Sequence, residues 1–395
     1  MATDQDQTDA AAHAAALEAL IHAEIERAGG ALAFDRFMDL ALYAPGLGYY
    51  VAGATKLGAS GDFVTAPELS PLFGGCVAAQ CGEVLAALGG GDLLEFGAGS
   101  GALATQVLAA LAEQGVPPVR YLILEPSPDL AERQRALLAE RAPCWLERVH
   151  WVQRLPEGFR GVMLANEVLD AMPVHRFALG AGGEVLECLV TAPDGGLALV
   201  TGAPVSPGLA AAVERITALA RAAGRPLPPG YRSELNLRLG PWMRAVADAL
   251  SAGMLLLIDY GYPRAEYYLP ERRDGTLLCH HRHQAHADPL ANLGLQDITA
   301  HVDFTAVAEA GAAAGLGLAG YTSQAQFLIG CGLDRLLAAG AGDPAAMLDL
   351  AAGAKQLILP SAMGERFQAM ALTRAVEPPA SGWCGFSVRD LSGRL

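Results

Sequence analysis

The sequence predicts an α/β fold in which helices flank a mostly parallel β-sheet. Three observations support this prediction: an apolar segment at Asp92–Phe96, a glycine-rich turn directly after it, and a helical pattern over residues 102–114 that leads to a second apolar segment at Tyr121–Leu124. A strand, a helix and a second strand in this order form a βαβ unit, whose two strands run parallel.

Further strand-like segments follow at residues 150–152, 162–165 and 254–258, so the sheet is expected to contain at least five strands. Each segment ends in polar residues. In open parallel sheets ligands bind in the crevice beside the carboxyl ends of the strands. The polar residues at these ends are therefore the first candidates for a functional site.

Other structure surrounds this core. Residues 11–27 have apolar side chains at helical spacing, and Gly29 and Gly30 end the helix. We expect residues 1–90 to form a helical extension with a site-forming segment rich in glycine and aromatic residues, and residues 91–176 to form the ligand-binding core. Residues 177–250, with a hairpin at 185–190 and 197–201 and a helix at 209–223, are expected to cap the crevice. Residues 251–395 complete the core.

Composition narrows the function. The chain has 395 residues, 52% hydrophobic and 17% charged, which is enough to bury a large core. A net charge of −15 opposes binding to nucleic acid. The seven cysteines show no C-x-x-C spacing, the first residues are acidic, and the densest apolar run, Met254–Ile258, is far shorter than a membrane span. These features predict a cytoplasmic protein without membrane insertion.

The glycine-rich turn is the strongest local signal. Gly97, Gly99 and Gly101 stand between the first strand and the first core helix. Glycines allow a ligand to approach the backbone, and a helix N-terminus offers N–H groups to anions. Gly97, Gly99 and Ala102 also fit the dinucleotide pattern G-x-G-x-x-G/A, with Glu125 placed as a ribose ligand. A nicotinamide-dependent oxidoreductase therefore remains an alternative at this point.

Two details favour a methyl donor, S-adenosylmethionine. Glu95 lies two residues before the first glycine, and the sheet begins only after about ninety residues. Glu95 would hold the ammonium group of the donor's methionine, and Glu125 would accept the ribose hydroxyls. The predicted fold is therefore the Rossmann-like fold of class I methyltransferases.

A second polar segment follows the fourth predicted strand. It presents Asn166, Glu167 and Asp170 at the crevice, where Asn166 is expected to contact the donor and the carboxylates to orient a cationic acceptor. The strand-end motifs of enzymes that methylate bases in nucleic acids are absent from this segment. A helix N-cap is the alternative for the carboxylates, above all for Asp170.

Several long motifs together resemble those of the MidA family, over nearly the whole chain. They are Tyr43-x-x-x-x-x-Tyr49-Tyr50, Gly61-Asp62-Phe63-Val64-Thr65-Ala66-Pro67-Glu68, Glu95-x-Gly97-x-Gly99-x-Gly101, Glu125-Pro126-Ser127, Ala165-Asn166-Glu167-x-x-Asp170-Ala171-x-Pro173, Ile258-Asp259-Tyr260-Gly261, Asp297-Ile298-Thr299-Ala300-His301-Val302-Asp303-Phe304 and Met363-Gly364-Glu365-x-Phe367. The family includes a mitochondrial complex I assembly factor that is a protein arginine methyltransferase.

The resemblance implies methyl transfer from S-adenosylmethionine to an arginine of a partner protein, with a respiratory complex I subunit as one candidate partner. Glu167 is the first candidate for holding the guanidinium, followed by Asp170, Glu234 and Asp259. Asp62 would reach the donor, unless it only closes an Asx turn. Direct transfer requires no metal, and the histidines between His280 and His286 are not assigned to one. A dimer is compatible with the sequence.

The chain could also serve as an assembly factor that retains a donor site with little turnover. An acidic surface and a capping insertion would suit either role. A substitution at Glu167 that abolishes methylation and leaves function in cells intact would favour the assembly role.

Overall fold

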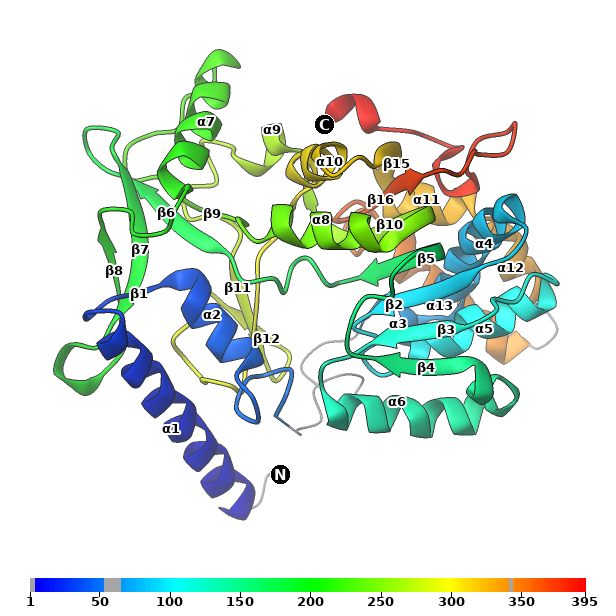
Figure 1. Ribbon diagram of the computed structural model, residues 1–395, viewed down its shortest axis with the longest axis horizontal. Coiled ribbons are helices and arrows are strands. Elements are labelled where there is room, and N and C mark those ends of the chain that lie inside the picture. The colour runs from blue at the N-terminus through cyan, green and yellow to red at the C-terminus, as the bar shows by residue number, and fades with distance from the viewer. Residues whose placement is uncertain (1–3, 53–64, 341–343) are drawn as a thin grey trace.

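The computed structural model describes residues 4–52, 65–340 and 344–395. Figure 1 shows two lobes side by side: a large lobe built on the main sheet, and a smaller lobe that contains most of the inserted segment and the first helix of the chain. The predicted α/β fold is confirmed by the main sheet, which has helices on both faces.

The main sheet has eight strands. Seven follow the order β15-β16-β10-β5-β2-β3-β4, and β14 pairs with the end of β10. Strands β4, β3, β2, β5 and β10 pair in parallel, whereas β16 is antiparallel to both of its neighbours. The strands are β2 (Asp92–Phe96), β3 (Tyr121–Leu124), β4 (Val149–Val152), β5 (Phe159–Asn166), β10 (Leu250–Tyr262), β14 (Val302–Asp303), β15 (Gly317–Ser323) and β16 (Phe367–Arg374).

Alternating apolar residues bind helices to both faces of this sheet. In β10, Leu256 packs with one helical layer, whereas Leu255 and Leu257 pack with the other. The first layer contains α4 (Pro71–Leu88), α5 (Ala102–Glu113), α12 (Leu333–Ala339) and α13 (Pro344–Ile358), and the second contains α8 (Leu239–Ala249) and α10 (Phe304–Ala313). The remaining helices of this lobe are α3 (Ala66–Leu69), α6 (Pro128–Arg141) and α11 (Gln324–Gly330).

One helix in the described part of the chain, α4, is long and apolar enough to cross a membrane. In this structure 72% of that 18-residue window is buried inside the protein. It packs against α5 and contributes to the hydrophobic core on one face of the main sheet. The apolar composition of α4 is therefore accounted for by its position in the core.

The smaller lobe joins the N-terminal segment to the insertion. Its antiparallel sheet contains β1 (Leu32–Ala33), β6 (His175–Leu179), β7 (Val185–Thr191), β8 (Ala198–Gly202) and β9 (Arg232–Leu235). The predicted hairpin is confirmed, because β7 and β8 pair antiparallel. Strand β1 also pairs with β7, which ties the two segments into one sheet. The helices of this lobe are α1 (Asp4–Arg27), α2 (Phe34–Tyr43), α7 (Leu209–Ala222) and α9 (Arg264–Tyr267).

The histidine-rich segment is a hairpin of the smaller lobe, packed with residues of α1 and α2. Strands β11 (Leu278–His281) and β12 (Gln284–His286) pair antiparallel, and β13 (Asp297–Thr299) pairs with β11. Arg282 and His283 form the turn with φ of 50° and 61°. Two-residue hairpin turns need positive φ and usually contain Asn or Gly, so neither Arg282 nor His283 predicts this turn.

Candidate functional site

A cavity of about 510 Å³ lies beside the carboxyl ends of β2, β3, β5 and β10. Its wall includes side chains from both lobes, among them Glu95 and Glu167 from the core and Tyr43 and Asp297 from the smaller lobe. This is the position at which parallel sheets bind nucleotide-like ligands. We call it the donor cavity.

The glycine loop forms one side of the donor cavity. Gly97, Gly99 and Gly101 have φ of 56°, 54° and 87°, a left-handed region that favours glycine. Gly101 directly precedes α5, so the N-terminal amides of that helix follow the loop. The loop therefore presents backbone to a ligand at a distance that side chains would otherwise prevent.

Glu95 lies at the end of β2, with only 3% of its surface exposed. The Tyr121 hydroxyl donates a hydrogen bond of 2.6 Å to its carboxylate. Burial raises the pKa of Glu95 to about 7, against the opposing effect of the Tyr121 hydrogen bond. A buried carboxylate of this kind gains most from a cationic partner, as the ammonium group of a methionine would be.

Glu125 follows β3 and is held by two donors. The amide of Ser127 donates to Oε1 over 2.9 Å, and the Gln134 side chain donates to Oε2 over 3.0 Å. Burial is the largest cause of its raised pKa. Each carboxylate oxygen can accept a further hydrogen bond, so the position suits a ribose diol.

Gln134 was not identified from the sequence. Its Nε2 also donates to the Gly99 carbonyl over 3.0 Å, and its Oε1 accepts a bond of 2.8 Å from Trp151. Gln134 is fully buried in the middle of α6. It therefore links the glycine loop, Glu125 and β4.

Asn166 and Glu167 follow β5 on another side of the donor cavity. Asn166 Nδ2 donates to Glu167 Oε1 over 3.1 Å, while the buried Oδ1 of Asn166 has no hydrogen-bond partner among the described residues. Burial, and then the charge of Asp170, raise the pKa of Glu167 to about 8. Glu167 can thus accept a proton near neutral pH.

Asp170 lies on the same side, with 5% of its surface exposed. The Tyr260 hydroxyl donates to its Oδ2, and burial raises its pKa to about 6. It is not a helix N-cap, because the next described element along the chain is strand β6 and no described helix begins directly after Asp170. Glu167 and Asp170 are the two predicted catalytic residues that the structure brings together.

Asp259, on β10, bonds to the backbone of residues 168–170. Its Oδ2 accepts the backbone amides of Val168, Leu169 and Asp170 at 2.9–3.2 Å, and its Oδ1 accepts the amide of Tyr260 at 2.9 Å. It is 1% exposed and is not among the described residues that line the donor cavity. The carboxylate of Asp259 is therefore taken up by backbone amides of residues 168–170.

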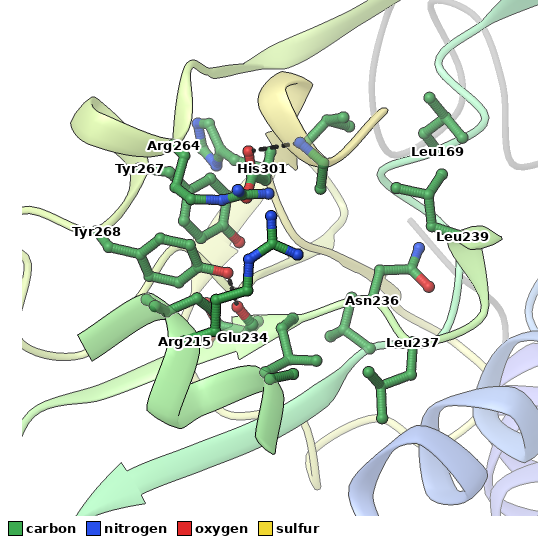
Figure 2. A pocket seen from close by; sticks show the side chains of 17 residues that line it. Leu169, Arg215, Glu234, Asn236, Leu237, Leu239, Arg264, Tyr267, Tyr268 and His301 are labelled. Carbon is green, nitrogen blue, oxygen red and sulfur yellow. Dashed lines mark hydrogen bonds and ion pairs between the residues drawn. The ribbon is translucent and has the colours of Figure 1, made fainter. Parts of the chain in front are cut away.

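Glu234 lies elsewhere, in a second cavity of about 180 Å³ that Figure 2 shows. The amide of Thr276 donates to it over 2.8 Å, and Arg176 Nε lies 3.4 Å from its carboxylate. Burial raises its pKa. The structure separates Glu234 from Glu167 and Asp170, although His301 lines both cavities. Asp62 lies outside the described residues.

The geometry suits S-adenosylmethionine in three respects. The glycine loop leaves room for a ligand at the backbone, Glu95 and Glu125 both line the cavity as carboxylates able to bond with ammonium and ribose groups, and the buried Asn166 Oδ1 can accept a further hydrogen bond. This arrangement at the end of a parallel sheet defines the donor site of a class I methyltransferase.

Comparison with known proteins identifies the family. A family model described as S-adenosyl-L-methionine-dependent methyltransferase matches residues 76–322, and the chain belongs to this family. "Protein arginine methyltransferase NDUFAF7, mitochondrial" of Mus musculus is 30% identical over 378 residues, which cover 87% of this chain and 81% of the relative. The protein of the same name from Danio rerio is 29% identical, with coverage of 86% and 83%.

A solved structure supports the donor assignment. A superfamily member from Burkholderia thailandensis, bound to S-adenosyl-homocysteine, is 42% identical with a TM-score of 0.91, and the match covers 98% of both chains. The protein is thus an S-adenosylmethionine-dependent methyltransferase, and the prediction of this cofactor is confirmed. The nicotinamide alternative is set aside.

The predicted cytoplasmic location is wrong by the same comparison. The relatives from Danio rerio, Mus musculus, Caenorhabditis elegans and Drosophila melanogaster are all named mitochondrial. The prediction relied on cysteine spacing and on the acidic first residues. Cysteine spacing reports the redox conditions of a protein and does not distinguish between reducing compartments.

Proposed function

We propose that this methyltransferase modifies a guanidinium nitrogen of an arginine in a partner protein. The observation that carries the proposal is the pairing of Glu167 and Asp170 on one wall of the donor cavity. Two carboxylates can hold a guanidinium through charge-assisted hydrogen bonds. The names of the curated relatives, which describe protein arginine methyltransferases, support the same acceptor.

Each residue of the site has a role in this reaction. Glu95, Glu125 and the glycine loop would hold S-adenosylmethionine, which supplies a methyl group already activated on a sulfonium. Glu167 and Asp170 orient the guanidinium so that one nitrogen lone pair points to the methyl carbon. Glu167 then accepts the proton that the guanidinium loses, because its raised pKa of about 8 suits a base near neutral pH.

The pKa of Glu167 also sets the expected pH dependence. A general base must be ionised in the free enzyme, so kcat/KM should rise with pH and level off above about 8. The charge of Asp170 contributes to this value, and Asp170→Asn should move the rise towards lower pH.

The test uses the purified chain, methyl-labelled S-adenosylmethionine and isolated respiratory complex I subunits as the first acceptors. Acid hydrolysis followed by mass spectrometry identifies the methylated amino acid. We expect methylarginine, and we expect Glu167→Gln to lower kcat at least about 100-fold while changing the affinity for S-adenosylhomocysteine less than about threefold.

Glu140→Gln is the matched control, because Glu140 is exposed on α6 and does not line the donor cavity. It should retain full activity. Label found on lysine or on carboxyl groups would contradict the proposed acceptor. Full turnover by Glu167→Gln would remove Glu167 from the proton-accepting role.

A further inference from the structure

Two tyrosine–aspartate pairs face the donor cavity, one from each lobe. In the core, the Tyr260 hydroxyl donates to Oδ2 of Asp170. In the smaller lobe, the Tyr50 hydroxyl donates to Oδ1 of Asp297 over 2.9 Å, and Asp297 is the first residue of β13. All four residues line the donor cavity. A hydroxyl that donates to each carboxylate fixes its orientation.

Tyr43 joins the two pairs. Its ring stacks on the ring of Tyr50 at 5.5 Å and 22°, and its hydroxyl donates over 3.0 Å to the carbonyl of Ala171, the residue after Asp170. Burial raises the pKa of Tyr43, and the charges of Asp297 and Asp170 raise it further. Both carboxylates therefore act on the same ring, and the pairs converge on one part of the cavity.

Asp170 has capacity for another partner. Asp170 Oδ1 is buried and has no hydrogen-bond partner among the described residues. His301 also lines this wall, in edge contact with Tyr260 at 5.0 Å, and burial lowers its pKa to about 4. A neutral histidine does not repel a cation. Arg366 lies at the rim and is exposed, so it can remain in water.

Carboxylates beside aromatic faces are the chemistry that binds an organic cation. The carboxylates contribute charge-assisted hydrogen bonds, and the rings contribute cation–π attraction. Since the glycine loop and Glu95 lie on the donor side, this group lies where an acceptor would have to meet the donor.

We propose that Asp170, Asp297 and the rings of Tyr43, Tyr50 and Tyr260 form an acceptor cage that selects a cationic side chain, with each lobe supplying one carboxylate. This inference rests on the proposed function and adds Asp297 and the three tyrosines as specificity-determining residues. Because Asp297 and Tyr50 belong to the smaller lobe, acceptor binding requires both lobes, whereas donor binding depends mainly on the core.

The test measures binding of small probes by calorimetry in the presence of saturating S-adenosylhomocysteine. The probes are Nα-acetyl-arginine methylamide, its lysine counterpart, and the neutral citrulline counterpart. We expect the arginine probe to bind at least about tenfold more tightly than the citrulline probe. Asp297→Asn should raise the Kd of the arginine probe on the order of tenfold. The affinity for S-adenosylhomocysteine should stay within about twofold.

Asp297→Asn preserves shape and keeps an oxygen to accept from Tyr50 and Ile298, which bond to Oδ1. Asp194→Asn is the matched control, since Asp194 lies exposed in a turn at φ 52° that asparagine tolerates. Thermal unfolding of both variants checks that the fold is intact. In turnover assays with an acceptor protein that the wild-type enzyme methylates, Asp297→Asn should raise KM for that acceptor and leave kcat within about threefold.

The outcomes separate this inference from the proposed function. Tighter binding of the lysine probe, lost in Asp297→Asn, would support the cage and overturn the arginine acceptor. Equal binding of charged and neutral probes, or an arginine probe unaffected by Asp297→Asn, would overturn the cage even if methylarginine is formed. If Asp297→Asn fails to fold, Tyr50→Phe removes the hydroxyl from Asp297 and should weaken the arginine probe by at least about threefold; no change would again overturn the cage.

Discussion

Gln134 provides the sharpest test of the donor site, because it lies outside the sequence motifs and yet connects two of them. The perturbation is Gln134→Met, which nearly preserves the volume of the side chain and removes its polar atoms. In the structure Nε2 donates to the Gly99 carbonyl and to Glu125, each over 3.0 Å, and Oε1 accepts from Trp151 over 2.8 Å.

The magnitude follows from these three hydrogen bonds. A net bond between neutral groups contributes about 1 kcal/mol, and a bond to a charged group about 2 kcal/mol. The free energy of unfolding should therefore fall by about 3–4 kcal/mol. Gly99 and Glu125 both lose a fixed position, so the Kd for S-adenosylhomocysteine should rise on the order of 10- to 100-fold, or about 1.4–2.8 kcal/mol.

Urea unfolding and calorimetric titration with S-adenosylhomocysteine measure the two effects. Gln80→Met is the matched control: Gln80 is also fully buried, and it accepts from the amide of Gly385 over 3.0 Å on α4, away from the donor cavity. It should lose stability without losing donor affinity. A Kd for Gln134→Met within twofold of the wild-type value would refute the role given to Gln134.

Two further predictions concern the donor side. Gly99→Val forces a β-branched residue into φ 54°, at a cost of at least about 1–2 kcal/mol. This variant should abolish detectable calorimetric binding of S-adenosylhomocysteine. Retained binding would contradict the role of the glycine loop in holding the donor. The pKa of Glu95 is about 7 in the folded protein, against an ordinary value of 4.5. The free energy of unfolding should therefore fall as pH rises between these two values, by about 3 kcal/mol from this group. Urea unfolding at pH 5 and 7.5 should show a smaller fall in Glu95→Gln, and an equal fall would argue against this assignment.

The sequence predicted where the donor cavity lies, because the signals for the glycine loop are local. A strand, three glycines and a helix lie within about twenty residues, and positive φ at Gly97, Gly99 and Gly101 explains why glycine stands there. The carboxylates at the ends of β2 and β3 follow from the same topology, since parallel strands end at one edge.

The acceptor side could not be predicted in the same way, because it depends on contacts between distant residues. Tyr50 meets Asp297 across 247 positions, and β1 pairs with β7 across about 155. Asp259 is a carboxylate near the end of a strand, which is why the sequence made it a candidate catalytic residue. Only the structure shows that its carboxylate accepts four backbone hydrogen bonds. Glu234 similarly required the structure to place it in the second cavity (Figure 2).

The strained backbone at Glu167 connects these two sides of the site. Glu167 has φ 52°, a conformation that costs a residue other than glycine about 1–2 kcal/mol. Its amide donates to the carbonyl of Ile258 over 2.9 Å, and the next three amides donate to Asp259, so β10 holds the turn on both sides of the strained residue. The result is that Asn166, Glu167 and Asp170 all line the donor cavity, and the Tyr260 hydroxyl donates to Asp170 from β10. Strain of this kind persists only where surrounding bonds impose it, and it is concentrated at functional sites, so the backbone at Glu167 agrees with the role proposed for this residue.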